Sequence, residues 1–252
     1  MATLCGFRKH IALFAFSAIL VGFASVETKA DMSGSLAYSG GLAAGGAWAS
    51  PGTVLTYNVG MVDGHYLYQY TLAVGDGAPE AVEAEEVKAA ISHLIFETSL
   101  DAKIFNFEAF ADPAHTIGVT GTLVKPDNYT ESNGNPGLGS ESIYGIKFDS
   151  PKPETNYLEF SFESNHQPMW GDFYAKDGKT DGQDNYLHNV GLGDLGDPLT
   201  DPARYDYDND DLRARHILVP DTIVVPVPGA VLLGAVGLSV AGGILRRKSK
   251  NA

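Results

Sequence analysis

Alternation of apolar and polar residues is the clearest pattern in the middle of the chain. In residues 65–72 every second position is Tyr or Leu, and in 157–163 Leu or Phe alternates with Glu or Ser. A period of two is typical of a β-strand with one buried face. Shorter apolar segments add further strands, at 54–59, 91–98, 117–124, 143–148, 170–175 and 215–219. Eight strands predict an all-β fold of the β-sandwich or jelly-roll type.

The segments between these strands are polar and rich in turn-forming residues. Residues 79–90 are rich in Ala and Glu, which favours a short helix, although tertiary context often overrides such a preference. The stretches 125–140 and 177–207 are expected to be long loops. Functional groups in sandwich folds tend to lie on such loops.

The N-terminal end has the features of a secretory signal peptide over residues 1–30. Arg8 and Lys9 precede an uncharged apolar run at 11–24, which is too short to span a bilayer. Small residues allow cleavage after Ala24 or after Ala30. Either cleavage removes Cys5, the only cysteine, so the exported chain is expected to have no disulfide.

The C-terminal end predicts a membrane-spanning helix. Residues 229–245 are seventeen uncharged, mostly small or aliphatic positions, about 25 Å of helix at about 1.5 Å per residue. A basic cluster follows, consisting of Arg246, Arg247, Lys248 and Lys250. The positive-inside rule keeps this end in the cytoplasm and the body outside.

The segment Val225-Pro226-Val227-Pro228-Gly229, followed by the apolar helix and the basic cluster, resembles the PEP-CTERM class of exosortase sorting signals. Val227 stands where the commonest motif of that class has Glu, so the tail is similar to the VPxP variant. The resemblance covers residues 223–252. It implies export through the secretion translocon and signal peptidase, tethering to the inner membrane, and cleavage by an exosortase-type transpeptidase. An unprocessed tail anchor is the alternative.

Residues 31–222 form the expected ectodomain, and several of its segments resemble uncharacterised ectodomains joined to such tails. Those segments are Ile91-Ser92-His93-Leu94-Ile95-Phe96-Glu97, Gly134-Asn135-Pro136-Gly137, Ser142-Ile143-Tyr144-Gly145-Ile146-Lys147-Phe148 and Trp170-Gly171-Asp172-Phe173-Tyr174-Ala175-Lys176. This resemblance implies no activity.

The net charge of the body limits the kinds of molecule that it can bind. The whole chain has a formal net charge of −14, but residues 31–225 hold ten Lys and Arg against thirty Asp and Glu, a net charge of −20. Such a surface repels phosphate backbones, which excludes nucleic acid. It either attracts divalent cations or basic surfaces, or keeps an exported domain soluble.

Asp206, Asp208 and Asp210 are candidate calcium ligands, because their spacing matches the first three ligand positions of an EF-hand loop. Asp211 replaces the required Gly, and Ile217 replaces the bidentate Glu. A calcium site of another kind and plain solvated acidic loops both remain open.

The catalytic motifs of common hydrolases and phosphate-binding enzymes do not occur in the chain, so we expect no enzyme activity. Trp170 and Tyr174 are candidates for a sugar-stacking platform, with core packing as the alternative. We therefore expect a structural or adhesive protein of the cell surface or extracellular matrix. A carbohydrate-binding module that contacts extracellular polysaccharide is the second hypothesis, and a secreted hydrolase is the third.

Overall fold

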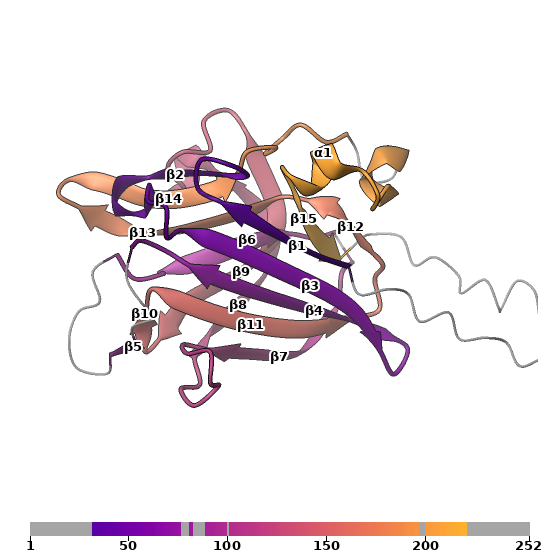
Figure 1. Ribbon diagram of the computed structural model, residues 1–252, viewed down its shortest axis with the longest axis horizontal. Coiled ribbons are helices and arrows are strands. Elements are labelled where there is room, and N and C mark those ends of the chain that lie inside the picture. Colours follow the sequence, from indigo (N-terminus) through magenta and orange to yellow (C-terminus); the bar gives the residue numbers. More distant parts are fainter. Residues whose placement is uncertain (1–31, 77–80, 83–88, 100, 197–199, 221–252) are drawn as a thin grey trace, which may run out of the picture.

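The computed structural model describes residues 32–76, 81–82, 89–99, 101–196 and 200–220. Within these ranges the chain forms fifteen strands, three 3₁₀ turns and one short α-helix, α1 (Asp210–Arg213) (Figure 1). The all-β class predicted from the alternation is confirmed.

One sheet contains five antiparallel strands: β1 (Met32–Ala37), β3 (Val54–Val62), β4 (His65–Ala73), β7 (Ile104–Phe110) and β11 (Tyr157–Ser164). Their order across the sheet is β1-β3-β4-β11-β7. Strands β3 and β4 form a hairpin that turns at Asp63 and Gly64, both with positive φ. An Asp-Gly pair is suited to this tight turn because both residues adopt left-handed backbone.

A second sheet contains six antiparallel strands: β2 (Leu42–Gly45), β6 (His93–Glu97), β8 (Thr120–Thr130), β9 (Ser142–Lys152), β13 (Phe173–Thr180) and β14 (Gln183–Asn189). Their order is β2-β14-β13-β6-β9-β8. Two small ribbons pair β5 (Ala81–Val82) with β10 (Glu154–Thr155), and β12 (Pro168–Gly171) with β15 (Ile217–Pro220). The 3₁₀ turns are η1 (Gly46–Trp48), η2 (Glu131–Asn133) and η3 (Pro202–Tyr205).

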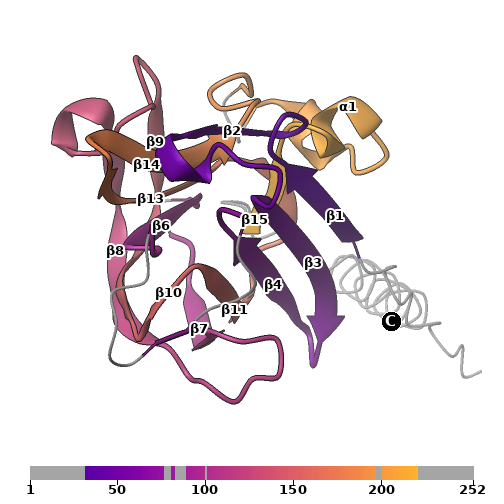
Figure 2. The same ribbon diagram turned by 60° about the vertical axis from the view of Figure 1, so that its left-hand side comes forward.

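The two large sheets face each other around one aromatic core (Figure 2). Tyr70 of β4 stacks on Phe160 of β11 with ring centroids 4.9 Å apart. Phe96 of the opposite sheet stacks on Phe162 with centroids 5.0 Å apart. The residues that alternate in the sequence therefore supply the contact between the sheets, and burying such large rings is a major part of the stabilisation.

All eight expected strands overlap with observed ones, but 170–175 is divided between β12 and β13 at Asp172. Six further strands were not expected: β1, β2, β5, β7, β10 and β14. Strand β14 lies in a segment that the sequence assigns to a loop, because two of its three buried positions are Asn185 and Asn189. Asparagine at a core position hides the alternation by which a strand is recognised.

The predicted helix at 79–90 is wrong where the structure describes it. Ala81–Val82 is strand β5, paired with β10, and Ala89 has a positive φ of 59°. Both expected loops are also shorter than predicted, because residues 125–130 belong to β8 and residues 183–189 form β14. Pairing with neighbouring strands outweighs the weak local preference for helix or loop.

Residues 1–30 and 223–252, the expected signal peptide and sorting tail, lie outside the described residues. Within the described ranges, none of the helices has the length and apolar character that a membrane crossing requires.

Candidate functional site

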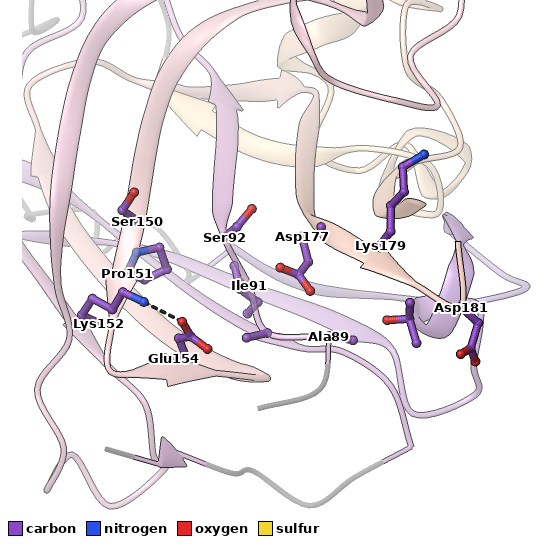
Figure 3. A pocket seen from close by; sticks show the side chains of 13 residues that line it. Ala89, Ile91, Ser92, Ser150, Pro151, Lys152, Glu154, Asp177, Lys179 and Asp181 are labelled. Atoms are coloured by element: carbon purple, nitrogen blue, oxygen red, sulfur yellow. Dashed lines mark hydrogen bonds and ion pairs between the residues drawn. The ribbon is translucent and has the colours of Figure 1, made fainter. Parts of the chain in front are cut away.

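A groove of about 590 Å³ lies on the described surface (Figure 3). One side is formed by the end of β9, where Ser150 and Lys152 lie, and by Glu154 of β10. The other side is the turn between β13 and β14, with Lys179 and Asp181. Figure 3 shows Ile91 and Ser92 on the floor between these two sides. Segments far apart in the sequence thus form one polar groove.

Both lysines that line this groove form ion pairs. Lys152 Nζ lies 2.6 Å from Glu154 Oε1, and Lys179 Nζ lies 3.5 Å from Asp184 Oδ2. The hydroxyl of Ser92 donates to the carbonyl of Lys176 at 2.9 Å. The described lining contains neither His nor Cys. The groove is suited to hydrogen bonding with a polar ligand.

A buried polar network around Asp172 lies between β12 and β13. Asp172 Oδ1 is 3.1 Å from His216 Nδ1 and accepts a hydrogen bond of 2.8 Å from Asn189 Nδ2. Its other oxygen accepts from the backbone N–H of Gly193 at 3.0 Å. A buried carboxylate needs several such donors, because an unpaired charge in the interior is costly.

The Asp172 and His216 pair has the relative arrangement of the acid and base in a hydrolase triad. The other ring nitrogen, His216 Nε2, is buried and has no hydrogen-bond partner among the described residues. It faces Gly191, where a Cβ atom would lie 2.3 Å from it. The position that a nucleophile would occupy is therefore closed by backbone, and the pair holds the loop after β14 against β15 instead.

A second part of the network joins Glu97 to Arg204. Glu97 Oε2 accepts from the backbone N–H of Asp172 at 2.9 Å, and Glu97 Oε1 lies 2.7 Å from Arg204 Nη2. Burial raises the pKa of Glu97, and the guanidinium of Arg204 opposes that rise. The loop that carries Arg204 is in this way tied to the end of β6.

On the outer face of the six-stranded sheet, the loop 131–141 covers a small separate cluster formed by Ile95, Tyr129, Leu138, Ile143 and Tyr174. Asn135 Oδ1 lies 3.1 Å from His93 Nε2, and the hydroxyl of Tyr174 donates to the carbonyl of Pro136 at 2.9 Å. Burial, opposed by the hydrogen bond to Asn135 and reinforced by the nearby Lys147 and Lys176, lowers the pKa of His93 to about 4. The Asn135-Pro136 segment thus serves to close this cluster.

Trp170 and Tyr174 are not a sugar-stacking platform, because both side chains are in the interior. Trp170 is 1% exposed and Tyr174 is 0% exposed. The Trp170 Nε1–H donates to the carbonyl of Asp206 at 2.8 Å. Both rings instead pack in the interior, which is the alternative role given above.

Asp206, Asp208 and Asp210 are all exposed. Among the described residues, no three His, Cys, Asp or Glu side chains gather closely enough to hold a metal ion. Asp210 instead lies beside Arg213, with Oδ1 3.4 Å from Nη1. The structure therefore does not bring the expected calcium ligands together.

The sorting motif, Val225, Pro226, Val227, Pro228 and Gly229, lies outside the described residues, as do Arg246, Arg247, Lys248 and Lys250. The sequence did not point to Asp172, Asn189, His216 or Arg204 as partners. These residues are too far apart in the sequence to form a recognisable motif. The segment around Asp172 only resembles other ectodomains, which implies no role for Asp172 itself.

Comparison of the chain with family models, curated proteins and solved structures gives no match.

Proposed function

We propose that the protein is an exported structural or adhesive component of the cell surface or extracellular matrix, tethered by its C-terminal helix and released by an exosortase-type transpeptidase. Its route requires the secretion translocon and signal peptidase. The resemblance of residues 223–252 to a sorting tail is the basis of this proposal. We also propose that the body acts without catalysis.

The limits of the folded body support the proposal. The first described strand, β1, begins at Met32, and the last, β15, ends at Pro220. Cleavage after Ala30 or after Ala24, and cleavage near residues 225–229, would all leave every described strand intact. A body with these limits is compatible with processing at both ends.

The β-sandwich fold of the body is part of the same proposal. Two antiparallel sheets that enclose one core support the description of residues 31–222 as a β-sandwich of the jelly-roll type.

The test is fractionation of the full chain in a bacterial host with and without an exosortase. We expect a membrane-bound form without the enzyme and a shorter form in the matrix with it. The double variant Pro226→Ala, Pro228→Ala is expected to stay in the membrane, because the motif that the enzyme would bind is altered. Pro113→Ala, at an exposed position of the body, is the matched control and should be processed normally. Recovery of the unprocessed full chain in the cytoplasm would contradict the proposal.

A further inference from the structure

A second, smaller cavity lies where the edge of the five-stranded sheet meets the β12–β15 ribbon and α1. Its volume is about 300 Å³, at the lower end of the range of small-molecule sites. Tyr57, Trp170 and Leu218, which are at most 2% exposed, form its inner wall. Ser33, Asp208 and Arg213 are exposed at its mouth. The cavity thus has a buried end and a polar, accessible end.

The hydroxyl of Tyr57 is buried and has no hydrogen-bond partner among the described residues. Gly34 makes room for it, since a Cβ at that position would lie 2.1 Å from the oxygen. Burial raises the pKa of Tyr57 to about 12, partly opposed by Arg213, so the hydroxyl stays protonated at neutral pH. Leaving such a hydroxyl unsatisfied in the interior is unfavourable, and a bound ligand hydroxyl would satisfy it after a small side-chain adjustment.

The mouth carries one positive and one negative side chain. Arg213 donates from Nη2 to the carbonyl of Tyr207 at 2.7 Å, and its Nη1 lies 3.4 Å from Asp210. A guanidinium has five N–H donors, so these two contacts leave others for a ligand. Asp208 supplies carboxylate acceptors on the same cavity. Tyr207 is held at the wall by a hydrogen bond from its hydroxyl to the carbonyl of Pro168.

We propose that this cavity binds a single neutral saccharide unit, with Arg213 donating to and Asp208 accepting from its hydroxyl groups, and Tyr57 bonding to the hydroxyl that enters deepest. A sugar hydroxyl both donates and accepts, so it can satisfy a guanidinium and a carboxylate at once. The proposal rests on the adhesive function above, and it identifies neutral polysaccharide as the material to which the exported protein adheres.

Charge distinguishes this ligand class from others of the same size. An anionic sugar would meet Asp208 and a body with an excess of twenty negative charges, ten basic against thirty acidic residues over 31–225. A quaternary ammonium would meet Arg213, and the buried rings of Tyr57 and Trp170 leave no open aromatic cage for it. A neutral ligand avoids both penalties.

Saturation-transfer NMR on the full chain, purified in a detergent without a sugar head group, tests the site. The probes are methyl hexopyranosides and neutral oligosaccharides, with glucuronic acid and choline as competitors for the alternative classes. We expect binding of at least one neutral probe. Tyr57→Phe should weaken the affinity for this probe about fivefold, which corresponds to the loss of one hydrogen bond. Arg213→Gln should weaken it about tenfold.

Tyr129→Phe is the matched control, because the buried hydroxyl of Tyr129 also has no partner in the described part of the chain. Tyr129 lies in the separate cluster on the other sheet. Both Tyr→Phe variants should keep or raise the melting temperature, whereas only Tyr57→Phe should weaken binding. Equal affinities of the two variants, binding of no neutral probe, or stronger binding of glucuronic acid or choline would each overturn the site. Sugar binding by a chain that fails the fractionation test would refute the proposed export route and leave the site standing.

Discussion

The guanidinium of Arg204 lies 2.7 Å from the carboxylate of Glu97, a residue 107 positions earlier in the chain. Arg204 is 2% exposed, and its remaining bonds go to the carbonyls of Trp170 at 2.9 Å and Gly196 at 3.1 Å. One buried side chain therefore joins η3, the end of β6, β12 and the loop before η3. This arrangement holds η3 against the six-stranded sheet and the β12–β15 ribbon.

Removal of Arg204 should be strongly destabilising. Arg204→Met leaves the largely buried Glu97 carboxylate without its cation, and breaking such a pair costs about 3 kcal/mol, the low end of the range for fully buried pairs. Urea unfolding measures the change. Lys152→Met is the matched control, since it removes the exposed pair with Glu154 and should cost less than about 1 kcal/mol. Similar losses in the two variants would contradict the structural role of the Arg204 pair.

Stability should fall on acidification because of His93. The folded-state pKa of about 4 is below the ordinary value of 6.5, so the unfolded chain binds a proton first as the pH drops. The resulting stability is present above pH 6.5 and is lost progressively as the pH falls toward 4. At about 1.4 kcal/mol per pKa unit, the loss is on the order of 2 to 3 kcal/mol. Urea unfolding from pH 7 to pH 4 should have a shallower pH dependence for His93→Gln, and parallel curves would refute this origin.

Gly137 and Gly139 form a matched pair for the loop over Tyr186. Both have positive φ, +86° and +61°, but a Cβ at Gly137 would lie 2.1 Å from the Tyr186 ring, whereas none of the surrounding atoms lies within 4 Å of one at Gly139. Gly139→Ala should cost about 1 kcal/mol from backbone strain alone. Gly137→Ala should cost about 1 to 3 kcal/mol more, because the ring must move. Denaturant midpoints measure both, and equal losses would show that the ring contact is unimportant.

Calcium chelation should leave the melting temperature unchanged. The carboxylates of Asp206, Asp208 and Asp210 are exposed and do not converge with other ligands, so the described body offers the ion no preformed site. Thermal unfolding with calcium, with magnesium and with EDTA measures this, since an ion that binds only the native state raises the melting temperature. A rise specific to calcium that disappears in Asp208→Asn would establish the site that the spacing suggested.

Strands with a clear apolar period could be predicted because the same residues face the core at every second position, as Tyr70, Leu158 and Phe160 do. Strand β14 could not, since Asn185 and Asn189 occupy two of its inward positions. Asn185 is satisfied there by the backbone N–H of Ala47 and by Thr180, and Asn189 by Phe173 and Asp172. A polar residue is compatible with the interior only when such partners exist, and they come from distant segments.

The sequence by itself determined the all-β class, the acidic character of the body and the expectation of a sorting tail, since these depend on local period, composition and short-range order. Only the tertiary structure decided that Trp170 and Tyr174 are buried, that Asp172 meets His216, and that Tyr57 and Arg213 line one cavity. The physical reason is that burial and pairing depend on which distant segments pack together, and a chain with hydrogen-bonding groups at widely separated positions does not specify those contacts by spacing alone.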